Sequence, residues 1–339
     1  LFFWVFTIAQ KAPNNDFAKE NFIKKEVYIP MRDGVKLFTS IYIPKDISKA
    51  KKYPFLMQRT CYSVAPYGET EYRSALGPNK YLMNEKYIFV YQDVRGRYMS
   101  EGTFTNMTPQ VERKSKKDVD ESTDTYDTID WLLQNITNNN GKVGQYGTSY
   151  PGFYTAAGIL ANHPALVASS PQAPISDFWN DDFLHNGKFM LGYFRTFPVF
   201  GVQKTKAEKD GWYMDSFIKP TSEDGLKFYR ELGTLKDGYE KYYKDNFFMT
   251  EIMHHPNYDE YWQKRSLLPH LKNVNHAVMT VGGWYDAEDL FGPLNIYKTI
   301  EKTSPKAKNT IVMGPFSHGA WSRETGKHFH SEIYFGDSI

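Results

Sequence analysis

A strand-like run that leads straight into a glycine-flanked serine is the feature of this sequence that most restricts its fold. Residues 143–146 (Val-Gly-Gln-Tyr) are typical of a buried strand, and residues 154–160 have the small and apolar side chains of a helix. Between them lies Gly147-Thr148-Ser149-Tyr150-Pro151-Gly152. Only a sharp turn joins two elements over so few residues, and glycines leave room for it. The pattern predicts a strand–turn–helix unit that holds the Ser149 hydroxyl clear of a sheet.

The rest of the chain alternates between strand and helix patterns. Two alternating runs flank an Asp33-Gly34 turn between Phe22 and Pro44, which predicts a β-hairpin. Helical spacing of apolar residues occupies Asp120 to Leu133. Further short apolar runs, typical of buried strands, are 54–58, 87–91, 165–169, 277–283 and 309–314. This alternation indicates an α/β fold with a mostly parallel sheet.

Residues 178–270 have a different character. Aromatic and charged residues mix there at helical spacing, as in Gly225 to Leu232 and Tyr239 to Phe248, and no strong strand run appears. We interpret this stretch as a helical cap inserted into the core. The expected organisation is an N-terminal arm at 1–20, a first part of the core at 21–177, the cap at 178–270 and a second part of the core at 271–339.

Charge and the N-terminus restrict the partners and the compartment. The chain has 41 basic and 39 acidic residues, so a nucleic-acid partner is not expected. Residues 1–8 are apolar but too short to span a bilayer, and no later stretch is apolar enough to do so. They are similar to the end of a signal peptide, with Ala9 near a cleavage point, which predicts a secreted or periplasmic protein. The alternative is an arm that packs on a partner surface, and a homo-oligomer stays open.

Two later residues follow strand patterns in the order that a serine nucleophile needs. Asp286 comes soon after the run 277–283, and His318 soon after 309–314. Both would lie in loops at the carboxyl ends of strands, where open α/β sheets place their ligands. His318 would accept the Ser149 proton, and Asp286 would orient the imidazole. The alternatives are an ordinary glycine-rich turn, since the second glycine comes one residue later than in Gly-x-Ser-x-Gly, and a capped loop histidine.

An acyl-transfer site also needs donors for the oxyanion. The Tyr150 amide follows the nucleophile and is one donor by geometry, and the Tyr62 hydroxyl, in the loop after an early strand, is a second candidate. The alternative for Tyr62 is simple pocket lining. No metal or other cofactor is predicted, because no acid or cysteine with ligand spacing accompanies His254-His255 or His328/His330. Cys61, the only cysteine, has no nucleophile motif around it.

Five motifs in order resemble those of the α-amino-acid ester hydrolases, relatives of cocaine esterases, glutaryl-cephalosporin acylases and Xaa-Pro dipeptidyl-peptidases. The resemblance covers roughly residues 25–335. It implies an α/β-hydrolase fold with a helical cap and a C-terminal β jelly-roll domain, and this sequence stops before such a domain. The motifs are Tyr28-Ile29-Pro30-Met31-Arg32-Asp33-Gly34-Val35-Lys36-Leu37, Arg59-Thr60-x-Tyr62, Asp93-Val94-Arg95-Gly96-Arg97-Tyr98-x-Ser100-Glu101-Gly102, Gly147-x-Ser149-Tyr150-x-Gly152 and Gly283-Trp284-x-Asp286-Ala287-Glu288-Asp289.

The resemblance also implies roles for particular residues. Ser149, Asp286 and His318 would be the catalytic triad, and Tyr62 and the Tyr150 amide the oxyanion hole.

A carboxylate cluster would hold the α-ammonium group of the substrate. Glu288 and Asp289 match two of its members, and Asp182 is the choice for the third, with Asp181 in reserve. Acids that share one pocket repel each other and need a cation, which suits an ammonium group. A bound Ca²⁺ would serve as well, and solvated loop acids are the plain alternative.

The function that this implies is a serine hydrolase. It would act on α-amino-acid esters and amides through an acyl-enzyme on Ser149, and would transfer the acyl group to β-lactam nuclei. Alternatives are an Xaa-Pro dipeptidyl-peptidase, a glutaryl-cephalosporin acylase or a cocaine-esterase-like carboxylesterase. A non-catalytic binding protein on the same fold is the competing class, because fold alone does not fix function.

Overall fold

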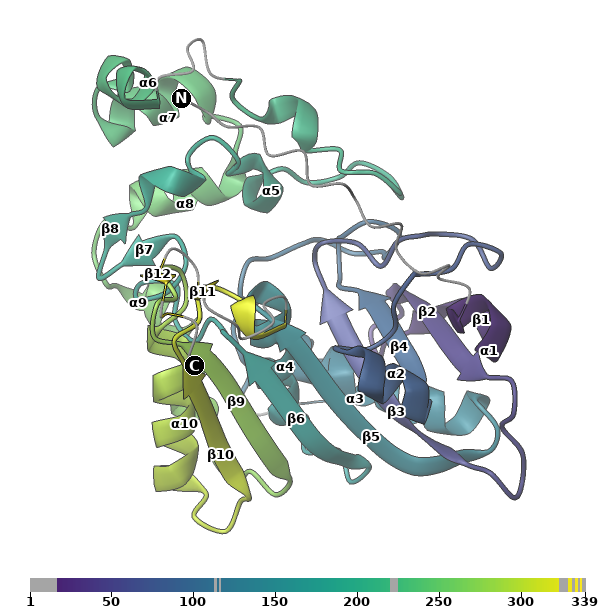
Figure 1. The fold of residues 1–339 in the computed structure, drawn as a ribbon. Coiled ribbons are helices and arrows are strands. Elements are labelled where there is room, and N and C mark those ends of the chain that lie inside the picture. The colour runs from purple at the N-terminus through teal and green to yellow at the C-terminus, as the bar shows by residue number, and fades with distance from the viewer. Residues whose placement is uncertain are drawn as a thin grey trace.

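One eight-stranded sheet runs through the protein, as the computed structural model in Figure 1 shows. The structure describes residues 17–112, 115, 117–219, 225–322, 329–330, 333–334 and 336. The predicted arm or signal segment lies almost wholly outside this part, as does His328. In spatial order the strands are β1 (Phe22–Pro30), β2 (Lys36–Pro44), β4 (Ile88–Asp93), β3 (Tyr53–Thr60), β5 (Asn139–Thr148), β6 (Leu166–Gln172), β9 (Ala277–Gly283) and β10 (Asn309–Gly314).

The sheet is antiparallel at one edge and parallel elsewhere. β1 and β2 form the predicted hairpin, with Gly34 in its turn at a φ of 90°, and β2 pairs antiparallel with β4. Every later neighbour, from β4–β3 across to β9–β10, is parallel. The predicted α/β-hydrolase fold with a mostly parallel sheet is therefore confirmed. The carboxyl ends of β5, β6, β9 and β10 meet at one edge of the sheet.

Helices cover the sheet unevenly. In Figure 1, α3 and α4 lie behind the strands, α2 lies in front of them, and α10 packs beside β9 and β10. Their bounds are α1 (Phe17–Asn21), α2 (Lys80–Glu85), α3 (Glu121–Asn135), α4 (Tyr150–Ile159) and α10 (Phe291–Thr303). The predicted helix at Asp120 to Leu133 begins one residue later, because Asp120 is its N-cap and accepts a hydrogen bond from the Thr123 amide.

Between β6 and β9 the chain forms short helices and turns above the sheet (Figure 1). They are β7 (Leu184–His185), β8 (Lys188–Phe189), η1 (Leu191–Tyr193), α5 (Pro198–Gly201), η2 (Met214–Ser216), α6 (Gly225–Leu232), α7 (Leu235–Tyr242), α8 (Phe247–His254), α9 (Glu260–Gln263) and η3 (Leu268–His270). We call this segment the cap. After β10 come η4 (Ala320–Ser322), β11 (Phe329–His330) and β12 (Ile333–Tyr334).

The cap differs from its sequence pattern at two places. The helical spacing over Tyr239 to Phe248 is divided between α7 and α8, because Asn246 caps α8 by accepting a hydrogen bond from the Met249 amide. The β7–β8 hairpin was not predicted, since strands of two residues leave no alternation to detect.

The cap and the sheet share one hydrophobic core. Phe178 follows β6 and packs against Phe248 of α8, with ring centroids 5.5 Å apart. Phe183 packs on Phe200 at 4.6 Å, and Phe197 stacks on Phe248 at 5.4 Å. These rings belong to the same buried cluster as Tyr150 and Phe153 of α4. The aromatic residues that are abundant in the sequence therefore join the cap to the hydrolase core.

Within the described residues, no helix combines the length and the apolar character that crossing a bilayer would require.

A substitution in this shared core is expected to destabilise both parts together. The Phe248 side chain is fully buried, and Phe248→Ala is expected to lower the free energy of unfolding by about 3–5 kcal/mol, as large-to-small changes in a packed core do. Thermal and urea unfolding followed by circular dichroism would measure it as one cooperative transition. Met214→Ala, at a cap residue that is 59% exposed, is the control and should change little. A second transition in Phe248→Ala, or no loss, would contradict the shared core.

Candidate active site

Ser149 occupies a strained turn between β5 and α4. Its φ of 67° and ψ of −129° lie outside the regions that a serine usually adopts, at the N-cap of α4. The Ser149 amide donates a hydrogen bond to the Gln172 carbonyl at the end of β6, 2.9 Å away. The predicted strand–turn–helix unit is therefore present, and its geometry resembles that of a nucleophile elbow.

Both flanking glycines are required by close approach of backbone atoms. A Cβ on Gly147 would lie 2.3 Å from the Pro151 carbonyl oxygen, and one on Gly152 would lie 2.4 Å from the Gln172 carbonyl oxygen. Gly152 therefore lets α4 pack against the end of β6. This explains why the second glycine comes one residue later than in Gly-x-Ser-x-Gly.

Asp286 and His318 form a hydrogen-bonded pair in the loops that follow β9 and β10, with Asp286 buried and His318 partly buried. The His318 Nδ1 lies 2.9 Å and 3.1 Å from the two carboxylate oxygens of Asp286. Asp286 Oδ1 also accepts hydrogen bonds from the amides of Glu288 and Asp289. Burial opposes ionisation of Asp286, but the hydrogen bond and charge of His318, together with the amides of Asp289 and Glu288, outweigh it, and the pKa of Asp286 is lowered. Burial likewise opposes charge on His318, but Asp286 and Glu288 raise its pKa above the usual value.

Gln172 links the neighbourhoods of Ser149 and His318. Its Oε1 accepts a hydrogen bond from the Thr148 hydroxyl at 3.2 Å and from the Trp321 indole at 2.8 Å. Thr148 precedes Ser149, and Trp321 lies three residues after His318. The nucleophile turn and the acid–histidine pair therefore open at the same edge of the sheet, as expected for ligand sites of α/β folds.

Tyr62 and Tyr150 lie against each other beside this edge. Their rings are 6.3 Å apart in an edge-to-face arrangement. Tyr150 is the first residue of α4, and amides in the first turn of a helix have no partner within the helix. Although Tyr62 is 40% exposed, desolvation and the nearby Cys61 and Asp182 raise the pKa of its hydroxyl well above the usual value. The hydroxyl therefore stays protonated and able to donate.

The two adjacent aspartates of the cap entry have different environments. Asp181 accepts hydrogen bonds from the Ser176 amide and hydroxyl through one oxygen and from the Gly292 amide through the other. Through these hydrogen bonds the Asp181 carboxylate connects the loop after β6 to the start of α10. Asp182 has a φ of 60°, and its amide donates to the Glu288 carbonyl 3.0 Å away. Both aspartates act electrostatically on Asp289, but the Asp181 carboxylate is already engaged by its own hydrogen bonds.

Asp182, Glu288 and Asp289 form a carboxyl cluster next to His318. Burial raises the pKa of Asp182 to about 7. A hydrogen bond from Tyr193 opposes this shift, and the negative charge of Glu288 adds to it. Both Asp289 oxygens are buried and have no hydrogen-bond partner among the described residues. Burial, followed by the charge of Asp182, raises the pKa of Asp289. The Glu288 Oε2 lies 3.6 Å from the His318 Nε2. Three mutually repelling acids in this position favour a positively charged ligand.

Tyr193 of the cap is a residue that the sequence analysis missed. Its hydroxyl donates a hydrogen bond to the Glu288 Oε2 at 2.7 Å. It lies in the short turn η1, far from every motif, so no local pattern marks it.

Other candidates take no part in this arrangement. Cys61 is buried, and desolvation raises the pKa of its thiol to about 12. His255 does have acid partners, Asp259 at 2.7 Å and Glu251 at 3.3 Å, contrary to the expectation from spacing. In the described part of the chain, no group of three or more histidine, cysteine or acidic side chains is placed to hold a metal ion.

Comparison with known proteins identifies similar chains. Residues 33–320 match the model of the X-Pro dipeptidyl-peptidase (S15) family. The cocaine esterase of Rhodococcus sp. (strain MB1 Bresler) is 25% identical over an alignment of 324 positions that covers 87% of this chain and 49% of that protein.

Two solved structures are similar over nearly the whole chain. An α-amino-acid ester hydrolase is 30% identical with a TM-score of 0.81, covering 99% of this chain and 54% of the other. An aminopeptidase from a marine-sediment archaeon, Thaumarchaeota archaeon, is 30% identical with a TM-score of 0.81, covering 97% and 53%. This chain thus spans about half the length of these relatives.

The close approach at Gly152 gives a direct test of the nucleophile turn. Gly152→Ala is expected to destabilise the fold by about 1–3 kcal/mol, the usual cost of overpacking, because its Cβ would meet backbone that cannot rotate away. Urea unfolding would measure the change. Gly225→Ala, at an exposed helical glycine with open space around it, is the matched control and should be neutral or slightly stabilising. Equal behaviour of the two variants would show that the close approach is not required.

Proposed function

This chain belongs to the X-Pro dipeptidyl-peptidase (S15) family, a family of hydrolases related to cocaine esterase and α-amino-acid ester hydrolase, and we propose that it is a serine hydrolase for substrates with a free α-amino group. The substrates would be α-amino-acid esters and amides, and a β-lactam nucleus would accept the acyl group in place of water.

The proposed reaction proceeds through an acyl-enzyme. The His318 Nε2 takes the Ser149 proton as the Ser149 oxygen attacks the substrate carbonyl, and Asp286 stabilises the imidazolium that forms. The Tyr62 hydroxyl and the Tyr150 amide donate to the oxyanion. The imidazolium then protonates the leaving alcohol or amine. Water, activated by the same nitrogen, cleaves the acyl-enzyme and frees the acid.

The carboxyl cluster is the observation that supports an amino substrate. An α-ammonium nitrogen is separated from the scissile carbonyl carbon by one carbon atom. A site for it must therefore lie beside the reacting atoms, which is where Glu288 lies, 3.6 Å from the His318 Nε2. The buried, unpartnered Asp289 carboxyl gains most from a cation. Two neighbours at 30% identity are named for substrates with an amino terminus or an α-amino acid, which agrees with this reading.

Amino-group recognition can be tested by paired substrates. Phenylglycine methyl ester is expected to be cleaved with a kcat/KM at least about tenfold higher than phenylacetate methyl ester. A pair of opposite charges 4 Å apart contributes about 4 kcal/mol at an effective dielectric constant of 20, well above the 1.4 kcal/mol that tenfold needs. Asp182→Asn should reduce this ratio, whereas Asp215→Asn, at a cap residue outside the cluster, should keep it.

Equal rates for the two esters would remove the amino preference but leave a carboxylesterase. Cleavage of Xaa-Pro amides without any ester preference would instead favour a dipeptidyl-peptidase. A fluorophosphonate probe should label the protein, and Ser149→Ala should abolish labelling. An unlabelled, well-folded wild type would indicate a non-catalytic binding protein.

The raised pKa of His318 predicts the pH dependence. The imidazole acts as a base only when neutral, so kcat/KM should rise with pH, with a midpoint above the ordinary histidine value of 6.5. Glu288 helps to hold the proton on His318, so Glu288→Gln should move the midpoint to lower pH. A deaminated ester, measured between about pH 5 and pH 9, separates this effect from ammonium binding. Glu301→Gln, at the far end of α10, is the control. A midpoint that is unchanged in Glu288→Gln would refute the coupling.

A further inference from the structure

Arg97, which contacts the residue before Tyr62, is buried and has no acidic partner among the described residues. Arg97 is 1% exposed, and its Nε donates a hydrogen bond to the Cys61 carbonyl oxygen 3.1 Å away. Neither Nη1 nor Nη2 has a hydrogen-bond partner within the described part of the chain. Burial of an unpaired charge is costly, so other interactions must offset it here.

Aromatic rings take the place of a carboxylate around Arg97. Its guanidinium carbon lies 4.6 Å from the ring centroids of both Phe104 and Trp212, and 5.2 Å from that of Tyr213. A desolvated cation over an aromatic face is stabilised by about 2 kcal/mol or more. Phe104 belongs to the core, whereas Trp212 and Tyr213 belong to the cap. The charge is therefore accommodated only when the cap is docked.

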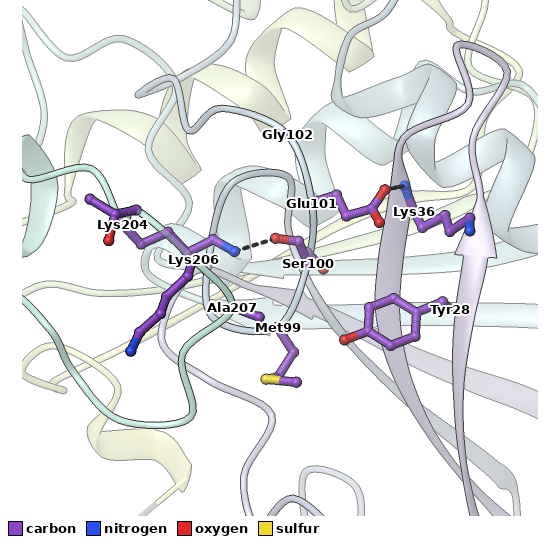
Figure 2. Close-up of a pocket in the computed structure, with 10 residues that line it drawn as sticks. Tyr28, Lys36, Met99, Ser100, Glu101, Gly102, Lys204, Lys206 and Ala207 are labelled. Atoms are coloured by element: carbon purple, nitrogen blue, oxygen red, sulfur yellow. Dashed lines mark hydrogen bonds between the residues drawn. The ribbon is translucent and has the colours of Figure 1, made fainter.

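Further contacts hold the cap segment 203–213 against the Arg97 loop. The hydroxyls of Tyr98 and Tyr213 are 2.7 Å apart. The Lys204 Nζ donates to the carbonyls of Tyr98 and Ser100, and Figure 2 shows the second of these bonds beside a pocket of about 500 Å³. These bonds fix the position of the rings that enclose Arg97.

The hydrogen bond from Arg97 acts on the peptide unit that carries Tyr62. The Cys61 carbonyl and the Tyr62 amide belong to one planar group. Arg97 holds the carbonyl end, and the Thr60 hydroxyl accepts a hydrogen bond from the Tyr62 amide at the other end, 3.0 Å away. With both ends held, the plane cannot rotate, and the direction in which the Tyr62 side chain leaves the backbone is fixed.

We propose that Arg97 is a positioning residue for the oxyanion donor Tyr62, and that the cap, through Trp212 and Tyr213, thereby takes part in forming the oxyanion site. This inference rests on the proposed function, because it gives Tyr62 the role of a donor in acyl transfer. It adds a residue that touches neither the substrate nor the triad.

Three variants test the inference on a deaminated ester, which does not depend on the carboxyl cluster. Arg97→Lys keeps the positive charge but loses the planar guanidinium and its Nε donor. Arg97→Met loses the charge as well as the donor. Trp212→Leu removes one of the cap rings that enclose Arg97. Each should lower kcat by about ten- to a hundredfold and change KM far less. The upper end of this range equals the smallest effect usually seen when a whole oxyanion donor is removed. The Ki of a boronic acid, which forms a tetrahedral adduct with the serine, should rise by a similar factor. The ratio of amino-ester to deaminated-ester rates should stay constant.

The matched control removes an arginine–aromatic contact elsewhere. Arg73 lies 4.2 Å from the Tyr91 ring centroid and contacts neither Cys61 nor the cap rings, so Arg73→Met should leave kcat and the boronic acid Ki unchanged. Circular dichroism and melting temperature identify any variant that fails to fold, and in that case the milder Arg97→Lys and Trp212→Leu decide.

A double-mutant cycle separates positioning of Tyr62 from a general structural role. In a Tyr62→Phe background, Arg97→Lys should lower kcat by less than about threefold, because the donor that it positions is absent. If the effects of Tyr62→Phe and Arg97→Lys on kcat were fully additive, the inference would be wrong. It would also be wrong if the folded variants kept the wild-type kcat and boronic acid Ki. Either outcome leaves the proposed function intact as long as the wild type hydrolyses esters. A wild type that hydrolyses no ester would instead overturn the proposed function, and this inference with it.

Discussion

The packing around Tyr150 is the constraint on which the site depends. The ring stacks on Tyr154 at 5.1 Å and on Phe200 of the cap at 6.0 Å, and it meets the edge of Tyr62. Its hydroxyl donates to Asn106 and accepts from a backbone amide in the same loop. Because Tyr150 directly follows Ser149, every one of these contacts also fixes the start of α4. The strained serine turn persists because the surrounding aromatic packing leaves it no relaxed alternative.

The electrostatics of the site follow from burial of acids at the carboxyl edge of the sheet. Asp286 is stabilised as an anion by His318 and by two backbone amides. Asp182 and Asp289 have no such set of donors, and their pKa values are raised. The loop after β9 therefore contains both Asp286, whose lowered pKa favours the ionised form beside His318, and Asp289, whose raised pKa favours the neutral form. The difference lies in the burial, the neighbouring charges and the hydrogen bonds of each carboxyl group, and not in the residue type.

The sequence contained the fold and the order of the site residues, but not their side-chain environments. The bounds of β9 and β10 were predicted residue for residue, because each strand is a short, mainly apolar run that ends at a glycine. The choice between Asp181 and Asp182 depended on which carboxylate the Ser176 and Gly292 amides engage, and Gly292 is distant in sequence from both aspartates. The contact of Tyr193 with Glu288 and the aromatic enclosure of Arg97 likewise join the cap to the core across more than ninety positions. Periodicity reports only local structure, so neither contact could be predicted from it.

The continuity of the core between cap and sheet has a consequence for the way molecules enter. A cap that hinged open would have to separate Phe200 of the cap from Tyr150 and Tyr62 of the core, and expose those rings to water. At about 25 cal/mol for each Å² of apolar surface, such an opening would cost as much as partial unfolding. We therefore expect the cap and the core to move as one body. A molecule that reaches the Ser149 turn would have to do so without the cap swinging away from the sheet.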